Sequence, residues 1–485
     1  MTSIEELQQE RLRKLEKLQA AGRDPYPAES HQSITIAELR SDFAAQTTGG
    51  EVTVAGRVMA ARGHGALMFV DLFDGTDRIQ GYLKDDTLED FALFQDVIDI
   101  GDFIELTGTP TVTKRGEESV AARSWQMLTK SLRPLPEKWA GVQDIDTKLR
   151  HRYLDILMHE ETRELFKKKA LFWHTVRNFL VARNFLEVET PTLEVTTGGA
   201  EATPFKTHHN DFDLDVFLRI SVGELWQKRL MAAGYPRTFE IGRTYRNEGS
   251  SAEHVQEFTN VEFYAAYMEY KEGMQLTKEL VLAIADQVFD TREFTTRGHT
   301  FNLNDEWKEL DYVDTVREMT GVDVLDASVA DMQSALDALG VSYEGDTKER
   351  LTDTLWKYCR KQISGPAFVI NHPKIVSPLS KAHPDDDRKT ERAQLLLAGA
   401  EVTNSFSELN DPRDQRARFE EQQRLLEAGD SEAMMPEWEF VEMLEYGMPP
   451  TFGFGMGERL FAFLVDRPIR EVQIFPLMKP KQDSH

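Results

Sequence analysis

The spacing of hydrophobic residues changes along the chain, and each change predicts a different kind of structure. From Ile4 to Ala21, leucines recur at helical spacing until Gly22 and Pro25 end the pattern. The basic residues between those leucines are Arg11, Arg13, Lys14 and Lys17. We predict an amphipathic helix within residues 1–30, whose basic side chains either face solvent or bind RNA phosphates.

Residues 51–132 alternate between apolar and polar side chains, which is the period of β-strands. Val52 opens the alternation, and Asp74-Gly75 is a typical turn of a β-hairpin. A helical stretch near Leu88–Val97 precedes a further strand at Phe103–Thr107. Five short strands with one helix before the fourth predict an OB-fold barrel.

One face of this predicted barrel carries side chains that suit RNA. Phe69 shares a strand face with Asp71, so we do not expect it in the deep core, and Gln80 shares a face with Tyr82. An exposed aromatic ring beside a glutamine can stack on an unpaired base and read its edge. A partly buried phenylalanine with a solvated glutamine explains the same pattern, and the residues alone leave both interpretations open.

A second, larger domain is predicted to follow the stiff linker Arg133–Lys138. We place the barrel domain at residues 31–138 and the second domain at 139–485. The second domain begins with a long amphipathic helix at Glu164–Arg183 and a short strand at Phe185–Glu189. Residues from about 291 to 357 are acidic and mostly helical in pattern, and we interpret them as an insertion.

The strands predicted at 238–248 and 257–264 form a hairpin with one polar face. Side-chain parity groups Glu240, Thr244, Arg246 and Glu248 on the first strand, and Phe258, Asn260, Glu262 and Tyr264 on the second. A solvent-exposed antiparallel face would also alternate in this way. It would not account for an Arg-Asn-Glu turn followed by His254 and Phe258.

Two later segments have the same character. In the strand at 402–409, Asn404, Phe406 and Glu408 share a face, and Glu401 precedes them. The segment Gly453–Arg459 is glycine-rich, which lets the backbone approach a ligand closely, and an apolar helical run follows it. Its GxGxG pattern does not meet the dinucleotide fingerprint, because Glu458 stands at the third glycine.

Composition narrows the classes of protein that remain. The 485 residues suggest two or three domains, and the single cysteine, Cys359, excludes an internal disulfide framework and fits a reducing cytoplasm. The chain starts without an apolar signal region, and no stretch reaches the roughly 20 apolar residues of a membrane span. We therefore expect a cytoplasmic protein without a membrane partner. The net charge of -26 argues against nucleic-acid binding, although a local basic face would overrule it.

These motifs resemble class II aminoacyl-tRNA synthetases. Arg246, Glu248, His254 and Phe258 match the family's motif 2, and TYRNEG, EFY and AEVTNSFSELND are similar to its bacterial lysyl members in subclass IIb. The resemblance implies an α+β fold, with an N-terminal OB-fold barrel joined to an antiparallel catalytic sheet flanked by helices. It implies activation of L-lysine with ATP and transfer to tRNA(Lys). The helix and strand at 164–189 resemble motif 1, which implies a homodimer.

The resemblance also assigns roles to residues. Those implied for catalysis and ATP binding are Arg246, Glu248, His254, Phe258 and Arg459; those implied for lysine binding are Gly199, Glu224, Glu262, Tyr264, Asn404, Phe406 and Glu408. Glu401 and Gln394 correspond to the Mg²⁺ ligands, and Arg62, Phe69 and Gln80 to the anticodon contacts. Residues 198–209 resemble the loop that covers the substrate.

The chain departs from its relatives at several places. Gln394 stands where relatives have a second metal carboxylate, and Glu253 where they often have arginine. Compared with the lysyl pattern, the chain has one extra residue before Glu224 and one residue fewer in the glycine-rich motif 3. Two alternatives therefore stay open: an aspartate- or asparagine-charging relative, or a non-catalytic paralogue that acts as an RNA-binding or regulatory module.

Overall fold

Two structural units follow one another along the chain, Met1–Gly141 and Val142–His485. The computed structural model describes residues 3–136, 144–199, 202–343, 345, 347–427 and 434–480. The domain boundary predicted at 138/139 lies outside these described residues. In the described part of the chain, no helix combines the length and the apolar character needed to cross a lipid bilayer.

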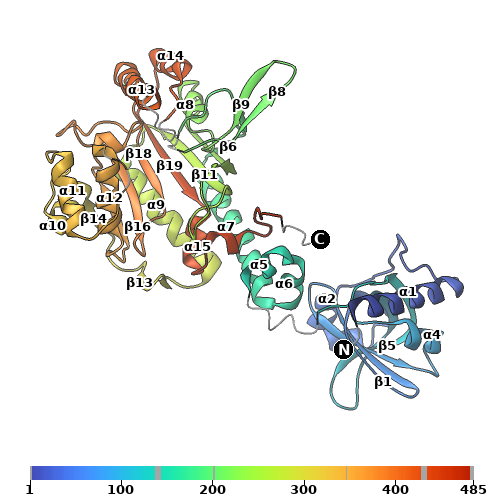
Figure 1. Ribbon diagram of the computed structural model, residues 1–485. Helices are drawn as coiled ribbons and strands as arrows, with labels where there is room; N and C mark the ends of the chain where they lie inside the picture. Colours follow the sequence, from blue (N-terminus) through green and yellow to red (C-terminus); the bar gives the residue numbers. More distant parts are fainter. Residues whose placement is uncertain are drawn as a thin grey trace. The chain divides into compact units, whose positions relative to one another are not determined.

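Unit 1 is a closed barrel with strand order β1-β2-β3-β5-β4 (Figure 1). Its strands are β1 Val52–His64, β2 Leu67–Phe73, β3 Arg78–Lys84, β4 Phe103–Val112 and β5 Glu118–Thr129. Burial alternates along β2 and β3, so that Val70 and Leu72 fill the interior while Phe69 and Asp71 stay on the outer face. Helix α4, Phe91–Val97, precedes β4. The predicted OB-fold is confirmed.

The other helices of unit 1 are α1 Ile4–Ala20, α2 Ile36–Ser41 and α3 Phe43–Gln46. Helix α1 turns Arg11, Lys14 and Lys17 toward other parts of unit 1, whereas the sequence left these side chains to solvent or to RNA phosphates. Arg11 is buried and donates to the Ile100 carbonyl at 2.8 Å, and Lys14 pairs with Asp99 at 2.7 Å. Lys17 pairs with Asp96, and Arg13 pairs with Glu10 on the helix itself. These contacts fix α1 to its own unit, so they favour an ordinary packed helix over one whose basic residues bind RNA.

The main sheet of unit 2 has the order β14-β15-β16-β18-β19-β11-β10-β6, with β17 paired to β16 (Figure 1). Its strands are β6 Leu186–Glu187, β10 Arg237–Tyr245, β11 Glu257–Ala266, β14 Lys308–Asp311, β15 Ala367–Ile370, β16 Arg392–Leu397, β17 Ala400–Glu401, β18 Asn404–Ser407 and β19 Thr451–Gly457. Neighbouring strands are antiparallel except at the two edges of the sheet. There β14 pairs in parallel with β15, and β6 pairs in parallel with β10.

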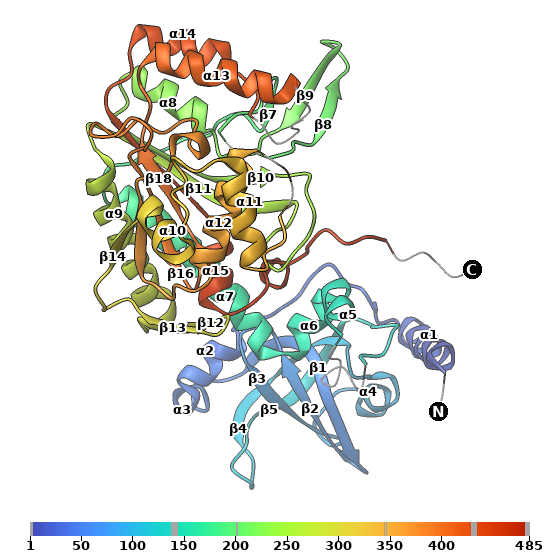
Figure 2. The same cartoon turned by 60° about the vertical axis from the view of Figure 1, so that its left-hand side comes forward.

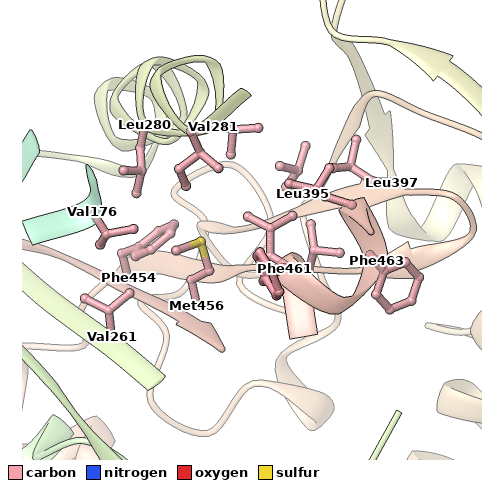
Figure 3. Close-up of a cluster of buried hydrophobic side chains, with 14 of the residues drawn as sticks. Val176, Val261, Leu280, Val281, Leu395, Leu397, Phe454, Met456, Phe461 and Phe463 are labelled. Atoms are coloured by element: carbon pink, nitrogen blue, oxygen red, sulfur yellow. The ribbon is translucent and has the colours of Figure 1, made fainter. Parts of the chain in front are cut away.

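One face of this sheet packs against α7, Glu160–Val181, and α9, Tyr270–Ile284. Val261 and Phe454 on the sheet meet Val176 of α7 and Leu280 of α9 in the largest hydrophobic core (Figure 3). Because strand residues alternate between faces, burying Val261 and Phe263 here turns Phe258, Asn260, Glu262 and Tyr264 toward the opposite face. The parity predicted for this hairpin is confirmed.

Unit 2 has further helices besides α7 and α9, most of them labelled in Figure 2. They are α5 Ile145–Arg150, α6 Arg152–Met158, α8 Glu224–Ala232, the π-helix Ala285–Phe289, α10 Tyr312–Thr320, α11 Val329–Ala338, α12 Lys348–Arg360, the 3₁₀ helix Lys374–Val376, α13 Pro412–Glu427, α14 Trp438–Tyr446, α15 Arg459–Leu464 and the 3₁₀ helix Ile469–Val472. Helices α10, α11 and α12 share a separate small core. They follow the hairpin of β12 Glu293–Thr296 and β13 His299–Asn302, so strands precede the helices in the segment predicted as a helical insertion.

Two predicted strands are shorter than expected. Strand β10 ends at Tyr245 because the Asn247 N–H donates to the Thr203 carbonyl at 2.8 Å instead of continuing the hairpin. The strand predicted at 185–189 is reduced to β6. A small three-stranded sheet has the strand order β7-β9-β8, with β7 at Leu193–Glu194, β9 at Leu214–Leu218 and β8 at Lys206–His209. Residues 200 and 201 of the predicted covering loop lie outside the described residues.

Candidate active site

The polar face of the sheet forms the wall of a cavity of about 380 Å³. It is lined by residues of α8, β11, β16, β18 and β19 and of the turn between β10 and β11. All the residues that the sequence assigned to this domain line it: Gly199, Glu224, Arg246, Glu248, His254, Phe258, Glu262, Tyr264, Gln394, Glu401, Asn404, Phe406, Glu408 and Arg459. Burial of Glu262 and Tyr264 excludes a solvent-exposed sheet face.

Arg246 lies at the loop end of the β10–β11 hairpin. Its N–H donates to the Gln256 carbonyl at 2.9 Å, which keeps the two chain segments paired one residue beyond β10. The guanidinium lies 5.4 Å from the centre of the Phe258 ring and donates to the Ile220 carbonyl at 3.3 Å. Burial lowers the pKa of Arg246, while Glu248 and Glu262 oppose this shift. A planar cation beside an aromatic face suits an anionic group attached to a flat ring.

A tight turn orients His254. The Ser251 hydroxyl accepts from the backbone N–H groups of Glu253 and His254, both at 3.1 Å. The same hydroxyl oxygen lies 2.8 Å from His254 Nδ1. Burial, followed by the positive charge of Arg459, lowers the pKa of His254. The imidazole is therefore neutral near pH 7 and available as a hydrogen-bonding group.

Arg459 is the first residue of α15 and points into the cavity. It forms an ion pair with Glu253, which also pairs with Arg297 at 2.8 Å. Sequence reasoning missed Arg297, because it belongs to the segment interpreted as an insertion without an identified role. In the sequence, Arg297 is marked only by the turn Thr296-Arg297-Gly298. This turn predicts a hairpin but does not show that Arg297 reaches Glu253.

Three buried carboxyl groups of the cavity, those of Glu224, Glu262 and Glu408, lie close enough to affect one another electrostatically. Glu262 accepts from the Val222 N–H at 2.7 Å, from Asn260 at 3.1 Å and from the Tyr264 hydroxyl at 3.1 Å. Burial and the neighbouring Glu224 raise the pKa of Glu262 to about 7. Three hydrogen bonds thus hold this carboxyl group in one orientation, at the edge of protonation near neutral pH.

A buried lysine joins the other two of these carboxylates. Lys228 Nζ lies 2.8 Å from Glu224 Oε1 and 2.5 Å from Glu408 Oε2, and its side chain is only 1% exposed. Burial by itself disfavours the charged ammonium, but Glu224 and Glu408 outweigh it and raise the pKa of Lys228. Sequence reasoning missed Lys228, although its place one helical turn after Glu224 was the available signal.

Two glycines give these carboxylates room. At Gly453, a Cβ atom would lie 1.9 Å from Glu408 Oε1. Gly199 has a φ of +87°, and a Cβ atom there would lie 2.9 Å from Glu224 Oε2. Any larger residue at either position would displace a carboxylate of the cavity.

Glu401 and Gln394 lie together on one side of the cavity. Turning the Gln394 amide lets its nitrogen donate to Glu401 Oε1 at 3.0 Å, and Trp356 Nε1 also donates to that oxygen. Among the described residues, no cluster of three His, Cys, Asp or Glu side chains is arranged to hold a metal. The Glu401 carboxylate suits Mg²⁺ when phosphate and water supply its other oxygens, whereas the turned Gln394 amide directs its oxygen to Arg392 and its nitrogen to Glu401.

In unit 1, the residues predicted to contact RNA share the outer face of β1–β3. The Phe69 and Tyr82 rings stack with centres 5.3 Å apart and planes 22° apart. Gln80 accepts from the Ser119 hydroxyl at 3.1 Å, and Arg62 pairs with Asp71 at 3.3 Å. The structure therefore adds Tyr82 to the aromatic surface on which a base can stack.

Comparisons with known proteins agree with this architecture. Residues 144–479 match the family of tRNA synthetases class II (D, K and N), and residues 52–134 match the OB-fold nucleic acid binding domain. The chain is 41% identical to the lysine–tRNA ligase of Thermotoga maritima, across 99% of this chain and 97% of that protein. It is 42% identical to the corresponding ligases of Roseiflexus sp. and Roseiflexus castenholzii, across 99% of this chain and 99% and 100% of theirs.

Proposed function

From the premise that the chain belongs to the class II tRNA synthetases, and among them to the lysine–tRNA ligases, we propose a two-step reaction at this cavity. Lysine first reacts with ATP to form lysyl-adenylate and pyrophosphate, and the lysyl group then passes to the 3′-terminal ribose of tRNA(Lys). One observation carries the proposal: the buried carboxylates of Glu224, Glu262 and Glu408 line the same cavity as the guanidiniums of Arg246 and Arg459. The carboxylates suit a substrate with two ammonium groups, and the guanidiniums suit a triphosphate.

The chemistry of both steps is a transfer without a covalent enzyme intermediate. In the first step, a carboxylate oxygen of lysine attacks the α-phosphorus of ATP and the bond to pyrophosphate breaks. In the second, a ribose hydroxyl attacks the lysyl carbonyl carbon, loses its proton, and AMP leaves. Because the first nucleophile is already ionised, the protein chiefly aligns the two substrates and neutralises their charge.

Arg246 is proposed to bring the two substrates together. Its planar guanidinium can donate to the lysine carboxylate and to the α-phosphate at the same time. Phe258 offers the adenine a stacking face, and Arg459 is proposed to lie against both the adenine and the phosphates. Glu248 and His254 are proposed as hydrogen-bonding groups for the adenine and the γ-phosphate.

The acidic part of the cavity is proposed to hold the two ammonium groups of lysine. Glu408 and Tyr264 receive the side-chain ammonium, while Glu224 and the Gly199 backbone receive the α-amino group. Asn404, Phe406 and Glu262 complete the wall. Burial raises the pKa of Glu262 and of Glu408, and the positive charge of Lys228 opposes both shifts, so a further cation such as the lysine ammonium favours the ionised carboxylates.

Mg²⁺ is the proposed cofactor, which Glu401 would hold together with ATP phosphates; Gln394 would join it only with its amide oxygen turned back toward the ion. When bound, the ion neutralises phosphate charge. The chain's own contribution is to present the Glu401 carboxylate, which Trp356 orients by donating to one of its oxygens.

Unit 1 is proposed to bind the anticodon of tRNA(Lys). Phe69 and Tyr82 offer stacking faces, Gln80 an edge-reading amide, and Arg62 a cation for the backbone. Their clustering on one outer face supports this assignment.

A homodimer is proposed through α7 and β6. Both elements leave apolar side chains exposed, with Leu171 at 40%, Val181 at 53% and Leu186 at 46%. Strand β6 also forms an edge of the main sheet, where a second copy can continue the packing. We propose a cytoplasmic location, where ATP and tRNA are present.

Lysine-dependent exchange of pyrophosphate into ATP tests the proposed function. Exchange with lysine supports it, whereas exchange with aspartate or asparagine identifies the other branch of the family. An aspartate-charging site would need a cation where Glu408 lies, and this position instead carries a carboxylate. Absence of exchange with all three amino acids would indicate a non-catalytic RNA-binding paralogue.

A further inference from the structure

Glu253 places a carboxylate between two arginines at the proposed phosphate site of the cavity. Arg297 NH1 lies 2.8 Å from Glu253 Oε1, and Arg459 pairs with the other oxygen. The Glu253 and Arg297 side chains are each about three-quarters buried. Glu253 lines the cavity, so this anion occupies space that a ligand can enter.

Arg297 is held in this position by several contacts. Its guanidinium lies 4.3 Å from the centre of the Phe463 ring, and that of Arg459 lies 5.4 Å from the same ring. The Arg297 N–H and the Thr296 hydroxyl both donate to Asp466 Oδ1, at 3.1 and 2.9 Å. Asp466 follows α15, the helix that begins with Arg459 and contains Phe463 (Figure 3), so α15 and the residues just after it hold both arginines.

The electrostatics mark an anion site. Burial lowers the pKa of Arg459, and the nearby Arg360 and Arg297 act in the same direction, while Glu253 and Glu401 oppose them. Arg459 Nε is buried and has no hydrogen-bond partner within the described residues. A cationic cluster with an unused donor suits a ligand with more oxygens and more charge than one carboxylate.

We propose that Arg297 is a second phosphate-binding arginine, and that in the empty site Glu253 takes the place of the terminal phosphates of ATP. This inference rests on the assignment of the cavity as an ATP site. When ATP enters, its terminal phosphates displace the Glu253 carboxylate and receive both guanidiniums. A triphosphate carries several negative charges against one for Glu253, so the exchange favours the nucleotide.

A simpler role competes with this proposal. The Glu253–Arg297 pair would then only position Arg459, and neither residue would touch ATP. The two roles predict opposite effects for Glu253: removing its charge eliminates a competitor of phosphate in the proposal, but loosens Arg459 in the alternative.

Binding of ATP and of AMP, each measured by calorimetry with Mg²⁺ and without lysine, separates the two. In Arg297→Gln, we expect the dissociation constant of ATP to rise by about tenfold or more, because a charge-assisted contact is lost. The AMP constant should stay unchanged, since AMP lacks the terminal phosphates. In Glu253→Gln, ATP should bind several-fold more tightly, and adding Arg297→Gln should still weaken it. Arg292→Gln, which removes an arginine paired with Asp286 just before β12, is the matched control and should bind ATP normally.

The inference is overturned if Arg297→Gln leaves ATP binding unchanged, or if it weakens ATP and AMP equally. It is also overturned if Glu253→Gln weakens ATP, or if Arg297→Gln has no effect in the Glu253→Gln background. Failure of the proposed ligase function is a different result, because it is read from lysine-dependent exchange by the unaltered chain. ATP and AMP affinities remain measurable in that case.

Discussion

Replacing Lys228 by methionine tests the charge balance of the acidic cavity. The side chain is 1% exposed and lies 2.8 and 2.5 Å from two carboxylates that are themselves buried. Methionine keeps most of the volume but removes the ammonium, which lies 5.5 and 5.8 Å from the centres of the Phe406 and Phe440 rings. The change therefore isolates the contribution of charge.

The expected loss is large because the carboxylates remain in place. Removing one partner of a buried ion pair costs about 3–5 kcal/mol, since the other charge stays buried without compensation. For a unit of this size, we expect the melting temperature of unit 2 to fall by roughly 4–7 °C. Scanning calorimetry measures this shift.

Free lysine provides the diagnostic step. Its ammonium groups can take the place of the missing cation, so added lysine should recover part of the lost stability of Lys228→Met. Lys130→Met is the matched control, because Lys130 is equally buried and pairs with Asp99 and Asp102 in unit 1. It should lose comparable stability, and lysine should not restore the unfolding transition of unit 1. The reasoning is refuted if Lys228→Met is as stable as the unaltered chain, or if lysine restores both variants alike.

Four further predictions address the site and the assembly. Glu408→Gln should raise KM for lysine by about tenfold or more in pyrophosphate exchange, because a charged hydrogen bond is lost; a similar rise in KM for ATP would contradict its assignment. The pKa of Glu262 is raised to about 7, so its carboxyl group is protonated below that pH and contributes stability that is lost as the pH rises through about 7. Above this pH the carboxylate is charged, and lysine should bind more tightly. Lysine titrations from pH 6 to 8 that show constant affinity in the unaltered chain would exclude this linkage. Phe69→Ala should weaken tRNA(Lys) binding by about 1–3 kcal/mol through lost stacking, without changing lysine-dependent exchange, and filter binding with exchange as the control distinguishes the two. Leu186→Asp should convert a dimer to a monomer in light scattering; a monomeric unaltered chain would remove the basis of that prediction.

Much of the local structure was predictable because strand periodicity depends on neighbouring residues. Alternation placed Val261 and Phe263 on one face of β11 and Glu262 and Tyr264 on the other, and the structure buries the first pair in the core. The order of strands around α4 similarly identified the barrel. Strand ends were less predictable, since β10 stops where Asn247 finds a partner in a distant loop.

What the sequence determined by itself is therefore the type of each element, the face on which each side chain lies, and the family through its motifs. Tertiary structure alone decided which charges meet. Lys228 lies between Glu224 and Glu408, Arg297 reaches Glu253 from a segment without a recognisable motif, and the basic residues of α1 pair with acids of its own unit. The physical reason is that periodicity follows from local backbone geometry, whereas ion pairs depend on sheet order and loop paths that bring remote residues together.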